Sequence, residues 1–247
     1  MTIARQKLVL SSTITNAAPF PYTMRFPVDL GILATMFNII FLCAALIGSA
    51  TAQAEEASAP PIKIIAFGDS LTAGYQLPAS AAFPAQLEKA LRAKGHNVVV
   101  INAGVSGDTT AAGLARLDWA VPNDADAVIV ELGANDFLRG IKPKILRTNL
   151  DKILERIAAK KKPILIAGMI SPQNWGGDYE TAATSIYPDL AKKHDALLYP
   201  FFMEGIARNP KLNLEDGLHP NAKGVAIIVE RILPLVEKLV DRVGKNP

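Results

Sequence analysis

Cysteine is almost absent from this chain. Cys43 is the only one in 247 residues, and it lies within an apolar stretch near the N-terminus. The rest of the chain therefore has no disulfide and no thiol chemistry, which excludes a disulfide-stapled scaffold and a cysteine nucleophile. The lack of cysteine in the rest of the chain is equally compatible with an exported protein.

A surplus of charge is also missing. The formal net charge is +3, from 26 basic and 23 acidic residues. Arg5, Lys7 and Arg25 precede residue 55, against Asp29 alone, so the remainder is close to neutral. A nearly neutral domain does not have the excess positive charge that is typical of nucleic-acid-binding proteins, so we expect no nucleic-acid partner. Hydrophobic content of 50% and charged content of 20% indicate a globular domain with a full core.

The N-terminal segment has the layout of an export signal. Residues 31–47 are uncharged and mostly apolar. Arg25 precedes this run, and small residues follow it at the spacing that signal peptidases accept. We therefore predict a signal peptide over residues 1–54, cut near Ala52 or Ala54, and a periplasmic or secreted protein.

An uncleaved membrane anchor is the alternative for this leader. The apolar run is long for a signal core and barely short of a membrane span, and Asp29 lies close to it. Met24 offers a second start, since residues 24–54 alone have the layout of a signal. Residues 55–61 are interpreted as a short linker.

From residue 62 onward, strand-like and helix-like patterns alternate. This alternation predicts right-handed βαβ units and one α/β domain over residues 62–247, with a five-stranded parallel sheet covered on both faces. The predicted strands are residues 62–67, 98–102, 127–132, 163–169 and 196–199, and the predicted helices are residues 83–94, 110–117, 144–159, 179–194 and 221–243.

A serine follows the first predicted strand. Ligands bind outside the carboxyl ends of the strands in open α/β sheets, so Ser70 lies where a nucleophile would be useful. By itself, the segment 68–70 is equally well a plain turn into a helix. The rest of the chain favours the functional interpretation, because it supplies the other parts that a serine hydrolase needs.

A serine nucleophile needs a base and a group that orients the base. The chain has three histidines. His96 and His194 follow helix ends and are interpreted as structural. His219 lies on a loop before the last helix, three residues after Asp216, whose carboxylate can curl back to the ring Nδ1–H. That arrangement leaves Nε2 free to face Ser70.

Acyl transfer also needs donors aimed at the developing oxyanion. Gly104 follows the second strand and can bring a bare backbone N–H close to substrate. Asn135 follows the third strand and carries a side-chain amide. Each alone is more simply a strand-to-helix turn, but both fall at the same sheet edge as Ser70.

These residues together carry a family resemblance. Gly-Asp-Ser-Leu at 68–71, Gly104, Gly-x-Asn-Asp at 133–136 and Asp-x-x-His-Pro at 216–220 resemble the four sequence blocks of the SGNH, or GDSL, hydrolase family. The similarity covers residues 62–240. More narrowly, the chain resembles the bacterial thioesterase I/lysophospholipase L1/arylesterase group in residues 67–75, 105–110, 200–204 and 216–221.

The resemblance implies a three-layer α/β/α sandwich, the flavodoxin-like SGNH hydrolase fold. It also implies that Ser70 is the nucleophile, with His219 as its base and Asp216 as the partner of the base. The backbone N–H groups of Ser70 and Gly104 and the side chain of Asn135 would form the oxyanion hole. No metal and no cofactor are implied. Ala134 is a departure, because the group usually has glycine there.

Apolar residues after Asn135 predict a substrate pocket. Phe137, Leu138 and Ile141 lie on a segment that must pass close to Asn135, although they could equally pack under the next helix. Trp175, in the Gly-rich segment 171–177 after the fourth strand, is predicted to stand on the opposite wall.

We expect an exported serine esterase that acts on acyl esters and thioesters, of the arylesterase, acyl-CoA thioesterase or lysophospholipase type, through an acyl-enzyme. Its partners would be small acyl ester, thioester or lysolipid substrates, with transient contact to a membrane surface, and the protein would be a monomer. One alternative is an O-acetyl esterase acting on polysaccharide, with Trp175 lining a sugar. The other is a non-catalytic cleft-binding protein.

Overall fold

The computed structural model describes residues 59–245. The predicted leader and most of the predicted linker lie outside these residues. Within them, no helix is both long enough and apolar enough to cross a membrane.

The centre of the domain is a five-stranded parallel sheet with the order β2-β1-β3-β4-β5. The central strands are buried on both faces, because their sequences are continuous apolar runs. Chain order reverses between β1 and β3, which is the point where open α/β sheets bind ligands. The strands are β1 (Ile62–Gly68), β2 (Val98–Gly104), β3 (Ala127–Glu131), β4 (Ile164–Ala167) and β5 (Leu197–Tyr199).

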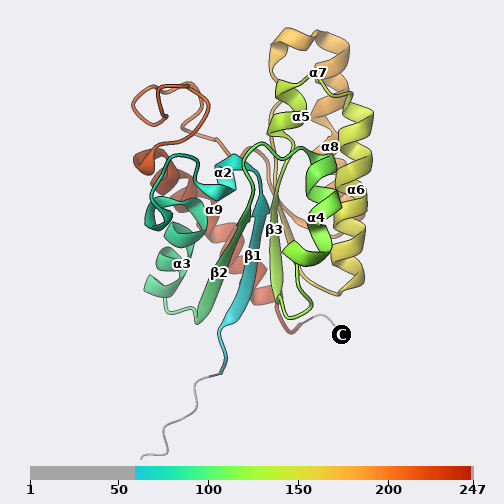
Figure 1. Cartoon of the computed structure of the whole chain (residues 1–247). Coiled ribbons are helices and arrows are strands. Elements are labelled where there is room, and N and C mark those ends of the chain that lie inside the picture. The colour runs from blue at the N-terminus through green and yellow to red at the C-terminus, as the bar shows by residue number, and fades with distance from the viewer. Residues whose placement is uncertain (1–58, 246–247) are drawn as a thin grey trace, which may run out of the picture. The chain divides into compact units, whose positions relative to one another are not determined.

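Helices cover both faces of the sheet, as Figure 1 shows. On one face α3 packs against α9, and on the other α6 packs against α4, α7 and α8. This three-layer α/β/α arrangement confirms the predicted fold class. The helices are α2 (Ser70–Ala73), α3 (Phe83–Ala93), α4 (Thr110–Ala120), α5 (Ala134–Leu138), α6 (Pro143–Ala159), α7 (Gly177–Thr184), α8 (Ile186–Lys193) and α9 (Ala222–Arg242), and 3₁₀ turns cover Ala79–Ala81 and Gln173–Trp175.

Two segments differ from the sequence prediction. The continuous helix expected over residues 179–194 is two helices, α7 and α8, which meet at Ser185. The segment after Asn135, expected as a loop, begins with the short helix α5. Both differences lie at the carboxyl edge of the sheet, where local packing decides the backbone.

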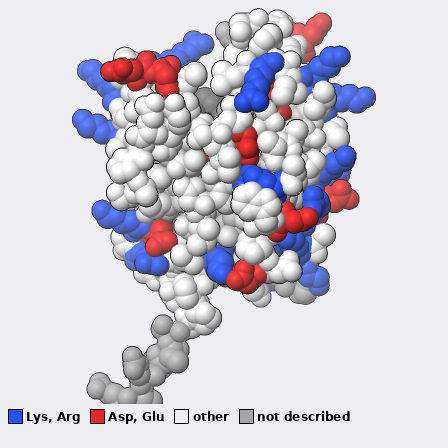
Figure 2. Space-filling view, viewed as in Figure 1, with Lys and Arg blue, Asp and Glu red and all other residues white. Residues whose placement is uncertain are grey.

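Charged side chains of both signs lie around the edges of the face shown in Figure 2, and uncharged residues cover much of its centre. Because acidic and basic groups are interspersed there, their fields partly cancel at physiological ionic strength.

Candidate active site

Ser70 lies at the carboxyl end of β1, on the first turn of α2. Asp69 caps this turn, since its Oδ1 accepts the Leu71 backbone N–H at 3.0 Å. Gly74 ends the turn in the left-handed conformation, with φ of 82°. The short helix thus fixes Ser70 between a polar cap and a sharp turn, with its hydroxyl directed at the sheet edge.

His219 and Asp216 lie on one tight loop before α9. Asp216 Oδ1 accepts the backbone N–H groups of Leu218 at 2.8 Å and His219 at 3.0 Å, which closes the loop on itself. Asn221 then caps α9 by accepting from Lys223 and Gly224. The sequence spacing of three residues therefore does bring the carboxylate back to its histidine.

The three side chains form one chain of hydrogen bonds. His219 Nε2 lies 2.9 Å from Ser70 Oγ, and His219 Nδ1 lies 2.7 Å from Asp216 Oδ2. In the tautomer protonated at Nδ1, His219 donates to Asp216 and accepts the Ser70 hydroxyl proton. The ring of Tyr75 packs on the imidazole with centroids 4.4 Å apart, which limits how far the ring can swing.

Asp216 has the electrostatics of a group that supports a cation. Partial burial opposes ionisation. The backbone N–H groups of His219 and Leu218 and the imidazole of His219 outweigh that burial and lower the pKa of Asp216. Its carboxylate is therefore available to stabilise a protonated His219.

The other histidines each contact an acidic side chain. His96 Nε2 faces Glu237 Oε1 at 3.3 Å, and Nε2 of the buried His194 ring faces Asp151 Oδ1 at 2.7 Å. Their interpretation as structural residues fits this placement, and among the three histidines His219 alone reaches Ser70.

Asn135, on the first turn of α5, faces the same space as Ser70. Its Nδ2 donates to Asp69 Oδ2 at 3.1 Å and to the Asp108 carbonyl at 3.0 Å. Both hydrogens of the amide are thus engaged, so an oxyanion would have to share or displace one acceptor. In the described part of the chain, the backbone N–H of Ser70 has no hydrogen-bond acceptor.

Gly104 ends β2 beside the Ser70 turn. Its N–H donates to Asn102 Oδ1 at 3.0 Å. A β-carbon at this position would collide with the backbone of Ala73 and Asp69, so close packing against α2 requires glycine here. Gly104 thus lies next to the nucleophile turn, although it does not line the cavity described next.

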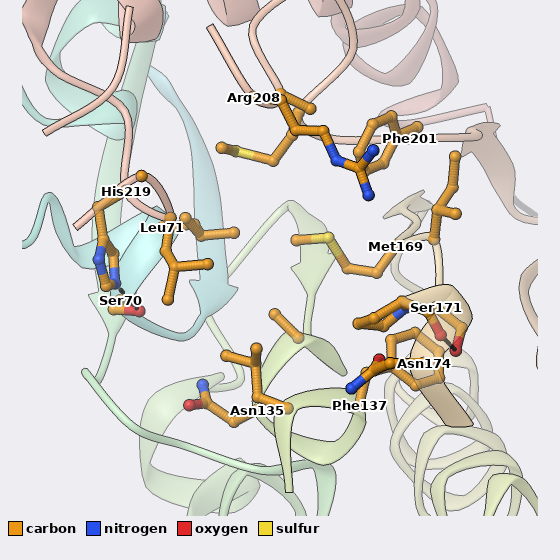
Figure 3. Close-up of a pocket in the computed structure, with 18 of the residues that line it drawn as sticks. Ser70, Leu71, Asn135, Phe137, Met169, Ser171, Asn174, Phe201, Arg208 and His219 are labelled. Carbon is orange, nitrogen blue, oxygen red and sulfur yellow. Dashed lines mark hydrogen bonds between the residues drawn. The ribbon is translucent and has the colours of Figure 1, made fainter. Parts of the chain in front are cut away.

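A cavity of about 640 Å³ opens beside the three side chains. Figure 3 shows Ser70 and His219 at one end and Met169, Phe201 and Arg208 across the space. Most of its wall is apolar. We call the end that holds Ser70, His219 and Asn135 the polar end of the cavity.

The predicted wall residues are placed in two groups. Phe137, Leu138 and Trp175 line the cavity, as predicted, and Trp175 Nε1 donates to the Phe137 carbonyl at 2.7 Å. Ile141 does not line it. The Ile141 carbonyl instead accepts the Tyr179 hydroxyl at 2.6 Å, which ties the end of this segment to α7.

The Trp175 ring lies directly against Gly140, whose φ is +62°. A side chain there would be strained and would meet the indole. Gly140 therefore permits a close contact between the two walls of the cavity.

Several wall residues were missed by the sequence interpretation. They come from the segments that follow β4 and β5, and from the His219 loop. The rule that sites form at carboxyl strand ends could have found them. All but Arg208 are apolar, so their types do not distinguish them from core residues. They include Met169, Ile170, Phe201, Met203, Arg208 and Leu218.

The described residues contain no group of three or more His, Cys, Asp or Glu arranged to hold a metal ion.

Two acidic residues near the nucleophile turn, Asp69 and Glu131, are buried. Burial raises the pKa of Asp69 to about 6 and raises the pKa of Glu131 well above its usual value, and the charge of Asp69 raises the latter further.

Comparison with known proteins identifies the family. The model of the GDSL-like lipase/acylhydrolase family matches residues 66–227, which include all three members of the hydrogen-bonded chain. The chain belongs to this family. It is therefore a hydrolase of ester or thioester bonds, and its fold is that of the SGNH hydrolases.

Relatives and solved structures agree with this assignment. An arylesterase of Vibrio mimicus is 39% identical over 193 residues, covering 78% of this chain and 92% of the relative. Thioesterase 1/protease 1/lysophospholipase L1 of Escherichia coli K12 is 39% identical over 179 residues, covering 72% and 85%. AlinE4, an SGNH-hydrolase family esterase of known structure, is 48% identical with a TM-score of 0.62, covering 73% of this chain and 97% of that one.

Proposed function

We propose that this GDSL-family protein is an exported serine esterase that cleaves carboxylic esters and thioesters through an acyl-enzyme. One observation carries the mechanism. The hydrogen-bonded chain from Asp216 through His219 to Ser70 ends at the polar end of an apolar cavity. A nucleophile, its base and a space for an acyl chain thus meet at one point.

The first half-reaction forms the acyl-enzyme. His219 Nε2 takes the Ser70 hydroxyl proton as Oγ attacks the carbonyl carbon, and Asp216 stabilises the imidazolium. The oxyanion is stabilised by the backbone N–H groups of Ser70 and Gly104 and by the Asn135 amide. When the intermediate collapses, His219 returns its proton to the departing alkoxide or thiolate.

The second half-reaction uses water in place of the alcohol. His219 takes a proton from the water, whose oxygen attacks the acyl carbon of the ester on Ser70. Collapse releases the carboxylic acid and returns the proton to Ser70 Oγ. No cofactor enters either step.

The apolar wall supports an acyl chain as the group that fills the cavity. Each buried methylene contributes about 0.8 kcal/mol, so affinity should rise with chain length until the cavity is filled. The names of the relatives, arylesterase and thioesterase 1/lysophospholipase L1, support ester and thioester substrates.

Exposed apolar residues around the cavity support transient contact with a lipid surface. These side chains are between 43% and 62% exposed, and such groupings mark interaction sites on soluble domains. They are Leu138, Ile170, Trp175 and Leu218.

A substrate panel tests this function. Purified protein would be assayed on p-nitrophenyl esters, acyl-CoA, lysophospholipid and acetyl-xylan. Hydrolysis of medium-chain esters and acyl-CoA is the expected result. Activity on acetyl-xylan alone would instead establish a polysaccharide esterase, and a folded protein that hydrolyses none of them would favour a binding role.

Export is supported by the apolar run at residues 31–47 and the small residues after it. N-terminal sequencing of the mature protein should find a start near Gln53 or Glu55. Protein that still carries residues 31–47 would establish the membrane-anchored alternative.

A further inference from the structure

A pair of buried acids lies directly behind the nucleophile turn. Asp69 and Glu131 are both 0% exposed. Glu131 Oε2 accepts the Asp69 backbone N–H at 3.3 Å, and the charge of Asp69 raises the pKa of Glu131. Two carboxylates this close in a dry interior cannot both be ionised at low cost. One of them therefore keeps a proton, and the surrounding bonds show which one.

The oxygens of Glu131 have different surroundings. Oε2 accepts from Thr72 Oγ1 at 2.8 Å and from the Asp69 backbone N–H at 3.3 Å. Oε1 is buried, and no donor in the described part of the chain reaches it. As a carboxylate oxygen, Oε1 would be a buried charge without a partner, whereas a protonated carboxyl group carries no charge there.

Asp69 already accepts two hydrogen bonds that matter to the site. Its Oδ1 accepts the Leu71 N–H, which caps the turn that carries Ser70, and its Oδ2 accepts Asn135 Nδ2. Hydrogen bonds to a carboxylate are about twice as strong as those between neutral groups. An ionised Asp69 thus holds the nucleophile turn and the Asn135 amide in one fixed arrangement.

The backbone makes room for this arrangement. Gly68 pairs with Glu131 across β1 and β3. A β-carbon at Gly68 would meet Thr72 Oγ1 and would lie 2.7 Å from Glu131 Oε2. The glycine of the Gly-Asp-Ser turn is therefore required by the carboxyl group packed behind it.

We propose that Glu131 is a positioning residue that keeps its proton and donates it to Asp69, so that Asp69, as a carboxylate, fixes the Ser70 turn and the Asn135 amide for catalysis. This inference rests on the proposed serine mechanism and adds a residue that touches neither substrate nor the reacting atoms.

The electrostatic surroundings agree with this placement of the proton. Burial and the neighbouring Asp69 both raise the pKa of Glu131, while the hydrogen bonds from Leu71, Glu131 and Asn135 oppose the effect of burial on the pKa of Asp69. The other titratable groups that interact with the pair are His219, from the loop before α9, and Tyr187, from α8. Both effects favour the proton on Glu131 rather than on Asp69.

Infrared spectroscopy tests the proton directly. The spectrum of the wild-type protein at pH 8 minus that of Glu131→Gln should contain the carbonyl stretch of a protonated carboxylic acid, and this band should shift in deuterium oxide. Absence of the band would overturn the inference. This measurement does not depend on hydrolysis, so it separates failure of this inference from failure of the proposed function, in which the wild-type protein would hydrolyse no ester.

Kinetics test the positioning role. Glu131→Gln keeps a donor toward Asp69 and an acceptor toward Thr72, and should keep kcat within about 3-fold of wild type. Glu131→Ala loses a hydrogen bond to a charged group, and should lower kcat by about 10- to 100-fold with KM unchanged. If Glu131→Ala does not fold, the kcat of Glu131→Gln and the infrared band still test whether Glu131 is a protonated positioning residue.

Asp126→Ala is the matched control. Asp126 accepts the Lys63 backbone N–H at 2.7 Å at the other end of the same strand pair, so its loss loosens the sheet without reaching Asp69. It should lower Tm and leave kcat unchanged. A kcat for Glu131→Ala equal to wild type, or an equal loss in both Glu131 variants, would overturn the inference.

Discussion

The two ends of the cavity are built in different ways. At the polar end, Ser70, Asn135 and His219 are each held by directional hydrogen bonds. At the apolar end, the wall comes from α5 and from segments after β4 and β5, and side chains such as Leu138, Met169 and Phe201 contribute mainly apolar surface. One end is fixed by bond geometry and the other by packing.

This difference separates chemistry from selectivity. Proton transfer between Ser70 and His219 requires hydrogen-bond distances, so each polar group is held by partners from other elements. An acyl chain requires only apolar area, which has no preferred direction. Substitutions at the polar end should therefore change kcat, and those at the apolar end should change the dependence on chain length.

The largest effect is expected from Ser70→Ala. Loss of the nucleophile should lower kcat by about 10⁴- to 10⁶-fold and leave Tm nearly unchanged, because only one hydroxyl is removed. Ser171 also lines the cavity, and Ser171→Ala should stay close to wild type. Residual activity above a few per cent in Ser70→Ala would show that Ser70 is not the nucleophile.

Asn135→Ala should have the next largest effect. Loss of one oxyanion donor lowers kcat by about 100- to 1,000-fold with little change in KM, since the bond forms chiefly in the transition state. Asn174, which also presents an amide to the cavity, supplies the control Asn174→Ala, with kcat near wild type. A rise in KM alone would make Asn135 a binding residue.

The polar end should also make stability depend on pH. The pKa of Asp69 is about 6 in the folded protein, against an ordinary 3.8. The folded state therefore binds this proton more tightly than the unfolded state. This contribution to the free energy of unfolding is fully present below pH 3.8, and is lost as pH rises to 6, by about 3 kcal/mol at most.

Asp69→Asn removes that titration. Chemical denaturation between pH 4 and pH 7 should show a smaller fall in stability for the variant than for the wild-type protein. The slope with pH, rather than the stability at one pH, is the quantity compared, since the amide also alters the bonds to Leu71 and Asn135. Equal slopes would show that Asp69 does not titrate in this range.

The smallest effect is expected at the apolar end. Leu138→Ala should lower kcat/KM for octanoate esters by about 5- to 20-fold and spare acetate esters, because acetate does not reach this wall. Ile141→Ala is the control from the same segment, outside the cavity, and should change neither. Equal losses on acetate and octanoate would mean that Leu138 supports the catalytic frame instead.

Much of the polar end could be predicted from the sequence. Ser70, Gly104 and Asn135 each follow a short, mostly apolar run that predicts a buried strand, and parallel strands end at one edge. Asp216 and His219 are three residues apart on one loop, so their contact is local. Predicting that these residues meet at one site required only the order of the strands and helices along the chain.

The apolar end could be predicted only in part. Leu138 and Trp175 were found because they lie near a strand end. Ile141, for which packing under the next helix was the equal alternative, does not line the cavity, because the Tyr179 hydrogen bond ties its carbonyl to α7. The sequence does not predict a role for Glu131. No sequence pattern indicates that an acidic residue at the end of one strand is buried behind the turn that follows the neighbouring strand.

The central claim is that His219 and Asp216 activate Ser70 as a nucleophile at the mouth of an apolar cavity. Labelling of the full-length protein by a fluorophosphonate, mapped by mass spectrometry, tests it most directly. We expect one adduct per chain, on Ser70, and much slower labelling of His219→Ala. A folded wild-type protein that is not labelled at Ser70 would contradict the account.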